Sequence, residues 1–320
     1  MPMALQSPAT APAPDQPSEI AAARAELARL IAARNQIEGV VVTPVPGLTL
    51  YRSTTLTTCT SAVYEPSLIL YAQGEKRVHI GSTTYTCDEA HFRLTSVDLP
   101  VISEVTRATP EEPLLGLILK LEMGMVREIL SQEEFLTPEA AFGARGMAVG
   151  KTPADLLSAC SRLLDLLDTP RDIPFLGSLL QREIVYRVLR TPLGRNLRAI
   201  ATLGEQSNRT AKAVHWLRSN FDKPLRVEEL ASVAQMGVST LHHHFRSLTA
   251  MSPLQYQKRL RLHAARLRMM TEGMDAASAA FEVGYESASQ FNREYSRFFG
   301  QPPMRDIKAR RFAVAATAGD

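Results

Sequence analysis

The sequence has few cysteines and no long apolar run, and each absence narrows the kind of protein it encodes. Cys59, Cys87 and Cys160 are the only cysteines among 320 residues. Their wide spacing matches neither a zinc-ligand pattern nor a disulfide framework. No apolar stretch approaches the roughly 18 residues that a membrane helix needs. We therefore expect a cytoplasmic protein in a reducing compartment, with no metal, no cofactor and no membrane association.

The first residues also lack the basic region and apolar block of a signal peptide. The stretch "MPMALQSPATAPAPDQPSE" is rich in Ala and Pro, which is typical of a disordered lead-in over residues 1–18. The whole chain is 45% hydrophobic and 22% charged, as in ordinary globular proteins. Its length suffices for two domains.

Charge is distributed unevenly along the chain. Residues 206–310 carry 16 Lys and Arg against 9 Asp and Glu, a net charge of +7, whereas the remainder carries 20 against 24, a net charge of −4. A basic C-terminal third on a slightly acidic body favours a nucleic-acid-binding module joined to another domain.

The pattern of apolar residues divides the body into three segments. Residues 18–35 form a predicted helix with Ser18 as N-cap. Residues 38–122 contain short β-rich runs separated by turn residues, which predict six to eight strands in a small barrel or sandwich. Residues 124–205 have the apolar stripes of helices. We thus expect a sensing domain over 19–205, a DNA-binding domain over 206–310 and a tail over 311–320.

Residues 208–310 contain an internal repeat with an offset of fifty residues. The stretches "EELASVAQMGVSTLHHHFRSLTAMSP" and "SAAFEVGYESASQFNREYSRFFGQPP" each predict a short helix, a tight turn at Gly237 or Gly284, and a second helix. Two helix-turn-helix patterns in register are far more specific than one. The pairs at this offset are Leu241 and Phe291, Phe245 and Tyr295, Leu248 and Phe298, and Pro253 and Pro303.

Three consecutive histidines, 242–244, suggest a metal site at first sight. At about 100° per residue, Leu241, Phe245 and Leu248 form one buried stripe, and His243 lies nearly opposite it. His242 lies on one flank and His244 borders the core. Metal ligands on one helix need i,i+3 or i,i+4 spacing, which no pair among these three has.

The outward faces of the two second helices carry hydroxyl, amide, imidazole and guanidinium groups. Such groups suit base edges and phosphates, and Arg293 has the geometry for a bidentate contact with guanine. The outward residues pair at the fifty-residue offset: Ser239 with Ser289, His242 with Asn292, His243 with Arg293, and Arg246 with Ser296.

A basic helix over about 253–268 joins the two units. Its length of about 24 Å falls short of the roughly 34 Å between successive major grooves, which predicts bent DNA or one fully docked unit. Its basic side chains are expected to face phosphates or solvent, giving salt-dependent binding; they are Lys258, Arg259, Arg261, Arg266 and Arg268.

This arrangement resembles the AraC/XylS family of transcriptional regulators. The resemblance rests on "LASVAQMGVSTLHHHFRSLTAMSPLQYQKRLRLHAARLRM" and "AAFEVGYESASQFNREYSRFFGQPP", covers about 100 residues, and implies a seven-helix, all-α domain with two recognition helices. In this chain Gly237 replaces the usual N-capping Ser, at a cost of a few tenths of a kcal/mol. The base-facing positions that it implies are Ser239, His242, His243, Arg246, Ser289, Asn292 and Arg293.

The front part resembles the cupin-like N-terminal domain of one subgroup of this family. The segments "YEPSL", "QGEKRVHIG" and "SVDLPV" carry this resemblance, whereas Cys87 and His91 depart from it. The fold class is therefore α+β: a cupin-like β-barrel with flanking helices, followed by an all-α domain with two helix-turn-helix units. We expect no catalytic residue.

Two alternatives to a plain ligand sensor remain. A metal-dependent cupin enzyme needs a cluster of imidazoles and carboxylates, but residues 38–123 hold only His79 and His91. A thiol redox or electrophile sensor would act through Cys59 and Cys87, although free cysteines are more often small buried hydrophobes.

The favoured interpretation is a sequence-specific transcriptional regulator whose front domain senses a small molecule and controls promoter binding. The expected partners are double-stranded promoter DNA, an unidentified small-molecule effector, RNA polymerase and a second copy of the chain. The helices of residues 124–205 are expected to supply the dimer surface, by analogy.

Overall fold

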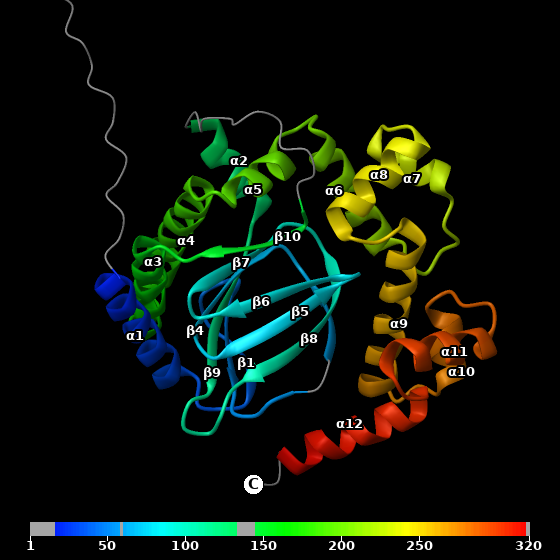
Figure 1. Ribbon diagram of the computed structural model, residues 1–320, viewed down its shortest axis with the longest axis horizontal. Helices are drawn as coiled ribbons and strands as arrows, with labels where there is room; N and C mark the ends of the chain where they lie inside the picture. Colours follow the sequence, from blue (N-terminus) through cyan, green and yellow to red (C-terminus); the bar gives the residue numbers. More distant parts are fainter. Residues whose placement is uncertain (1–16, 58–59, 133–144, 318–320) are drawn as a thin grey trace, which may run out of the picture.

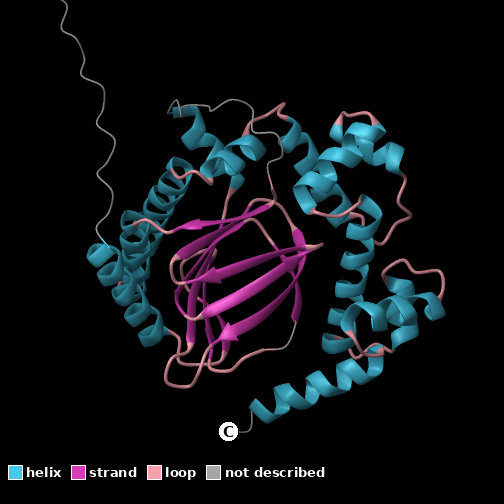
Figure 2. Ribbon diagram, viewed as in Figure 1, coloured by secondary structure: helices cyan, strands magenta, loops and turns pink. Residues whose placement is uncertain are grey.

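The computed structural model describes residues 17–57, 60–132 and 145–317. The described strands lie between residues 39 and 151, and helices form most of the remaining described chain (Figures 1 and 2). The elements are α1 (Pro17–Arg34), β1 (Gly39–Val42), β2 (Leu48–Ser53), β3 (Thr60–Tyr64), β4 (Ser67–Gln73), β5 (Glu75–Ile80), β6 (Thr83–Asp88), β7 (His91–Thr95), β8 (Leu99–Arg107), β9 (Leu114–Lys120), α2 (Met123–Gln132), β10 (Met147–Lys151), α3 (Ala154–Asp165), the 3-10 turns η1 (Leu166–Asp168) and η2 (Pro170–Asp172), α4 (Ile173–Arg190), α5 (Gly194–Ala201), α6 (Gln206–Ser219), α7 (Val227–Ala234), α8 (Val238–Thr249), α9 (Pro253–Thr271), α10 (Ala276–Glu282), α11 (Ala288–Phe299) and α12 (Pro303–Thr317).

Two antiparallel sheets wrap around one interior. One sheet has the strand order β1-β2-β9-β4-β7-β10, and the other has the order β3-β8-β5-β6. In Figure 1 the sheets form the central barrel, with α1, α3 and α4 on one side and the C-terminal helices on the other. This arrangement confirms the α+β class with a β-rich front and flanking helices.

Alternate side chains along the strands of the larger sheet point to opposite faces, and one of these faces packs against the helices. Leu48 and Leu50 of β2 pack in the same core as Leu27 and Ile31 of α1, and all four are buried. The next residue, Tyr51, joins a second core on the other face of the sheet. Because side chains alternate with a period of two residues, the odd-numbered residues of β2 line the barrel interior.

The helices α6–α12 form the two predicted units. Helices α7 and α8 make the first unit, α10 and α11 the second, and the 19-residue α9 joins them. Ser252 caps α9 in a capping box with Gln255, and Pro253 occupies the first turn, where a missing N–H is harmless. The described chain thus contains the expected seven helices after residue 205.

One hydrophobic core spans the barrel and the first unit. Val97, Leu99 and Met147 from the barrel side belong to the same buried cluster as Phe245 of α8 and Tyr256 of α9. The second unit has a separate cluster, built around Phe291 and Tyr295. The first unit is therefore docked on the barrel, whereas the second is attached mainly through α9 and α12.

The strand count differs from the sequence-based expectation. Residues 38–122 form nine strands rather than six to eight, and a tenth, Met147–Lys151, lies in a segment predicted to be helical. That strand, MAVGK, pairs with β7 at the sheet edge. Five residues are too few to show a period, so the local pattern could not reveal a strand that exists because of its tertiary partner.

Candidate nucleic-acid interface and effector site

The two recognition helices begin differently. Gly237 caps α8 with φ −67° and ψ 151° and no side-chain hydrogen bond, whereas the Ser287 hydroxyl, which caps α11, accepts a hydrogen bond from the backbone N–H of Gln290. The turn preceding α8 has its left-handed residue at Gln235, not at Gly237. Gly237 is therefore the N-cap, as the family comparison implies, and only Gly284 is a left-handed turn residue, which corrects the expected equivalence of the two glycines.

Helix α8 presents the expected polar face. Leu241 and Phe245 are completely buried. His244 is half-buried, and burial, followed by the neighbouring His243, lowers the pKa of its imidazole. The residues of α8 expected to face DNA are all exposed: Ser239, His242, His243 and Arg246.

Helix α11 repeats this arrangement. Phe291 and Tyr295 are completely buried, while Phe298, expected in the buried stripe, is only partly covered. The structure brings the corresponding residues together on the outer face of α11, where Ser289, Asn292 and Arg293 are exposed. Among the described residues, no three His, Cys, Asp or Glu side chains are grouped so that they could hold a metal ion.

Both recognition helices end in a left-handed residue. Ala250 closes α8 with φ 57°, and Gly300, fifty residues later, closes α11 with φ 78°. Glycine adopts this conformation freely, whereas a Cβ makes it unfavourable by roughly 1 kcal/mol or more. The first unit therefore carries strain that the second avoids.

Protein groups engage each of the basic side chains of α9, although the side chains of Lys258 and Arg268 remain 39% and 30% exposed. Lys258 pairs with Glu294 at 2.6 Å, and Arg268 pairs with Glu282. Arg261 donates to the carbonyl oxygens of Phe221 and Gly284. The repeated units and α12 pack around this helix, so these contacts stabilise their arrangement, and contact with phosphates stays a prediction.

The two remaining α9 arginines are also held. The guanidinium of Arg259 lies 5.3 Å from the Phe298 ring centroid. Arg266 is buried and donates two hydrogen bonds to Asp306, at 2.8 and 2.7 Å. It also donates to the Ser61 hydroxyl of β3, and so ties the second unit to the barrel.

Polar contacts reinforce the docking of the first unit. Arg218 of α6 donates to the carboxylates of Asp98 and Glu65. The Tyr256 hydroxyl donates to the Asp98 carbonyl at 2.8 Å, where both groups are buried. At the end of α8, the Leu248 carbonyl accepts a hydrogen bond from the N–H of Gly146. The front domain thus forms a hydrogen bond with the C-terminal end of the recognition helix α8.

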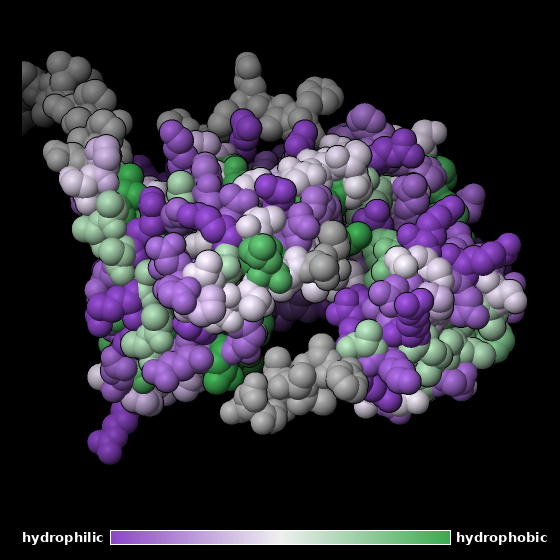
Figure 3. Space-filling view, turned by 60° about the horizontal axis from the view of Figure 1, so that its bottom comes forward, coloured by the Kyte–Doolittle hydropathy of each residue, from purple (hydrophilic) through white to green (hydrophobic). Residues whose placement is uncertain are grey.

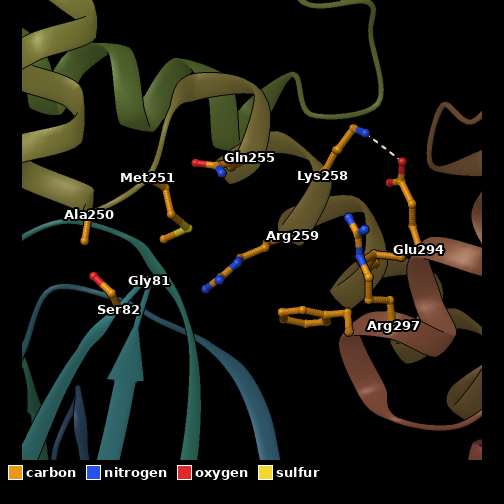
Figure 4. Close-up of a pocket in the computed structure, with 11 residues that line it drawn as sticks. Gly81, Ser82, Ala250, Met251, Gln255, Lys258, Arg259, Glu294 and Arg297 are labelled. Carbon is orange, nitrogen blue, oxygen red and sulfur yellow. Dashed lines mark hydrogen bonds and ion pairs between the residues drawn. The ribbon is translucent and has the colours of Figure 1, made fainter.

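A cleft of about 460 Å³ lies between the barrel and the recognition units. Figure 3 shows the hollow from below, and Figure 4 shows its lining. Gly81 and Ser82, in the β5–β6 turn, face Ala250 and Arg259 across it. A Cβ on Gly81 would come within 2.5 Å of the Ala250 carbonyl oxygen, so the turn approaches α8 as closely as a backbone can.

The barrel interior is the second candidate site. It combines aromatic, hydroxyl and cationic side chains from both sheets, although solvent reaches part of it. The strand registers and core contacts place the following residues on this concave face: Tyr51, Thr60, Ala62, Tyr64, Ile69, Tyr71, Lys76, Val78, Tyr85, Cys87, Arg93, Val101, Ser103 and Ile118.

Arg93 is the most unusual residue of this face. Its side chain is 1% exposed, and its guanidinium lies 4.3 Å from the Tyr64 ring centroid. Lys76, on the facing sheet, lies over the Tyr51 ring at 4.5 Å. The sequence analysis missed both residues. The one available signal was the alternation of β5, in which Lys76 shares a face with the buried Val78 and Ile80.

The two histidines of the front domain, His79 and His91, do not lie together as a catalytic site would require. His79 bonds Thr84 through Nδ1, and His91 bonds Asp88 at 2.6 Å, each beside solvent. Cys87 is completely buried on the concave face, and burial raises the pKa of its thiol, an effect that Arg93 opposes. Cys59 lies outside the described residues.

Comparison with known proteins decides the family. Residues 44–196 match the AraC-type transcriptional regulator N-terminus, and residues 230–309 match a helix-turn-helix domain. The chain belongs to the AraC/XylS family of transcriptional regulators. Its two matched regions coincide with the barrel plus flanking helices and with the two repeated units.

Curated members of the family are distant relatives. The HTH-type transcriptional regulator ArgR of Pseudomonas aeruginosa is 25% identical over 163 residues, 49% of this chain and 50% of ArgR. The HTH-type transcriptional activator RhaS of Yersinia pestis is 29% identical over 105 residues, 33% of this chain and 38% of RhaS. The chain thus spans about half or less of the curated relatives it matches.

A solved family structure shares the whole architecture. ToxT from Vibrio cholerae superposes with a TM-score of 0.53 at 10% identity, over 81% of this chain and 97% of ToxT. A second ToxT structure, bound to (E)-4-(8-methylnaphthalen-1-yl)but-3-enoic acid, gives 0.52 at 11% identity, over 78% and 93%. At such identity the likeness is one of fold.

Proposed function

We propose that this protein is a sequence-specific DNA-binding transcriptional regulator. One observation carries the proposal: two recognition helices, fifty residues apart, each expose a polar face above a fully buried apolar stripe. Two such faces suit two successive major grooves. The proposed DNA contacts are Ser239, His242, His243, Arg246, Ser289, Asn292 and Arg293.

The proposed input is a small molecule bound by the cupin-like front domain. The domain division at residues 205 and 206 belongs to this proposal, with the barrel as sensor and the helices as output. Because the first unit shares a core with the barrel, an effector that changes the barrel shifts the population of DNA-binding arrangements. The contacts at Arg218 and Leu248 define one of those arrangements.

The remaining parts of the proposal concern partners and location. Promoter DNA and RNA polymerase are the macromolecular partners, and the cytoplasm is the compartment. No described helix is long and apolar enough to cross a membrane. A homodimer would form through the front-domain helices, where Phe175, Leu176 and Leu179 of α4 are exposed.

A thiol sensor is the second candidate, and the structure gives it little support. A redox-active cysteine needs thiolate character and access to solvent. Cys87 has a raised pKa and no exposure. A catalytic cupin domain fits less well still, because the relatives are regulators and His79 and His91 bond to neighbouring side chains at separate places.

Selection of duplexes from a random pool tests the DNA-binding proposal. We expect the full chain to enrich one motif. Arg293→Ala should bind that motif roughly 5- to 150-fold more weakly and with relaxed preference at one position, since one bidentate contact contributes about 1–3 kcal/mol. Arg305→Ala, at an exposed position of α12, is the matched control. Unchanged affinity and preference in Arg293→Ala would overturn the assignment of α11.

A further inference from the structure

A second cleft, the junction cleft, lies where the front domain meets helix α6. Its volume is about 510 Å³, within the range of small-molecule sites. The loop after β7 contributes Ser96 and Val97, and α6 contributes Asn208 and Trp216. Figure 1 shows α5 and α7, which also contribute to the lining, on either side of α6 above the barrel. Its described lining shares no residue with the concave face of the barrel or with the cleft of Figure 4.

Two polar side chains that line the junction cleft are buried and lack a hydrogen-bond partner among the described residues. Asn208 is 7% exposed, and its Nδ2 donates to the Ile200 carbonyl oxygen at 2.7 Å. Because a carbonyl only accepts, this bond fixes the orientation of the amide and leaves the Asn208 Oδ1 as an acceptor without a donor. The Ser96 hydroxyl, in a residue that is 3% exposed, is also unpaired. A molecule that donates a hydrogen bond here satisfies a buried group that is otherwise destabilising.

The rest of the lining is largely apolar and includes one aromatic ring. Val97, Met123 and Ile200 contribute from three different elements, and Ala211 and Trp216 contribute from α6. The Trp216 side chain is half-buried, so part of its ring is open to the cleft or to solvent. Aromatic rings pack favourably against one another in stacked or edge-to-face arrangements. This lining therefore favours an aromatic body.

The charges of the described lining do not call for a charged ligand. Asp98 is its one carboxylate, and the guanidinium of Arg218 already donates to it. Arg127 and Lys212 are exposed, so water solvates both cations. The buried polar atoms without a partner belong to an amide and a hydroxyl, which are neutral. An uncharged molecule therefore enters at the lowest desolvation cost.

We propose that the junction cleft binds an uncharged aromatic molecule whose O–H or N–H group donates a hydrogen bond to the Asn208 Oδ1. This inference adds a site outside the barrel and rests on the proposed regulatory function only for its consequence. The front domain contributes Ser96 and Val97, whereas the DNA-binding half contributes Asn208 and Val233 of α7. A bound molecule therefore stabilises the docked arrangement of the two parts.

Trp216 is the single tryptophan of the chain, so its fluorescence reports directly on the junction cleft. The full chain is titrated with phenol, benzyl alcohol and benzamide, and with the methylated counterparts anisole, benzyl methyl ether and N,N-dimethylbenzamide. Methylation keeps the ring and adds apolar surface but removes the donor. Hydrophobic burial alone favours the methylated compound, whereas the proposed hydrogen bond favours at least one parent by about fivefold or more in Kd. If no parent binds more tightly than its counterpart, the proposal is wrong.

Two variants locate the binding. Ala211→Leu fills the cleft and is expected to fold with an unchanged or higher thermal midpoint and to lose the saturable fluorescence response. Ala277→Leu, at an exposed position of α10, is the matched control and keeps the response. Asn208→Ala should bind parent and counterpart with equal affinity, and Ala211→Leu decides the question if Asn208→Ala does not fold.

Binding that survives in Ala211→Leu, or a preference for the parent compound that survives in Asn208→Ala, contradicts the proposed site. Enrichment of a DNA motif by the full chain without added compound tests the regulator proposal separately. A chain that enriches a motif but prefers no parent compound overturns the junction site alone.

Discussion

Asp98, directly before β8, accepts a hydrogen bond from the guanidinium of Arg218 on α6, and this ion pair joins the barrel to the DNA-binding helices. Asp98 is 7% exposed, so removal of its partner leaves a carboxylate that water can barely reach. The pair therefore offers a direct measure of domain docking.

We expect Arg218→Met to lower the free energy of unfolding by about 2–3 kcal/mol, because a buried acceptor loses its charged donor. The double variant with Asp98→Asn should lose less than the sum of the two single variants. Urea unfolding of all four proteins gives the coupling energy, expected at about 1–3 kcal/mol. Additive effects would show that the two side chains do not interact.

The histidine triplet should separate into different roles. His243→Ala, at an exposed position, is expected to weaken binding to the selected DNA motif without changing stability. His244→Ala is expected to lower stability, since its ring is half-buried at the edge of the apolar stripe of α8. Gel-shift titrations and thermal unfolding distinguish the two. Equal losses of DNA affinity would mean that the helix phase is wrong.

His263 on α9 predicts acid sensitivity. Its ring packs edge-on against Phe298 and Phe299, and its Nε2 is buried without a partner. Burial, followed by the charges of Arg266 and Arg259, lowers its pKa to about 3. The folded protein therefore holds a neutral ring, while the unfolded chain takes up a proton below its usual pKa of about 6.5.

Stability from this group is complete above pH 6.5 and is lost as the pH falls towards 3. Between pH 6.5 and 5 we expect a loss of about 2 kcal/mol in the free energy of unfolding. Urea titrations at both pH values measure it, and His263→Phe should remove most of the loss. His243→Ala is the matched control and should retain it. Equal pH dependence in wild type and His263→Phe would contradict the buried neutral ring.

The helix ends give a reciprocal pair of variants. Ala250→Gly is expected to raise the free energy of unfolding by up to about 1 kcal/mol, because it relieves a left-handed alanine. Gly300→Ala should lower it by a similar amount, since no neighbouring atom lies near the added Cβ and only backbone strain counts. Thermal unfolding of both variants tests this. A stabilised Gly300→Ala would refute the role of the left-handed cap.

Periodicity in the sequence was sufficient to predict the two recognition helices. Leu241, Phe245, Phe291 and Tyr295 are buried where the repeat requires, because each helix carries its own apolar stripe. The roles of the α9 cations were not predictable in the same way. Arg266 is paired with Asp306, forty residues away, and no local pattern encodes such a partner.

The cations in the barrel interior could not be predicted from the sequence for a related reason. A cation at an inward position looks like any surface arginine until the strand register is known. The register places Arg93 opposite Ile69 and in the barrel interior. Likewise β10 exists only because β7 offers an unpaired edge. A feature that depends on one helix, such as its apolar stripe, is predictable from the sequence. A feature that depends on two residues or strands far apart in the sequence becomes visible only in the folded structure.

The core shared by Leu99, Met147, Phe245 and Tyr256 has a consequence for how such regulators diversify. Placing these helices behind a foreign sensor would expose Phe245 and Tyr256 to water, and the resulting chimera should be unstable or insoluble unless the new sensor supplied a matching apolar surface. Substitutions at the seam would have to arise in both halves together. In this chain the barrel and the first recognition unit therefore depend on each other for burial of their apolar side chains.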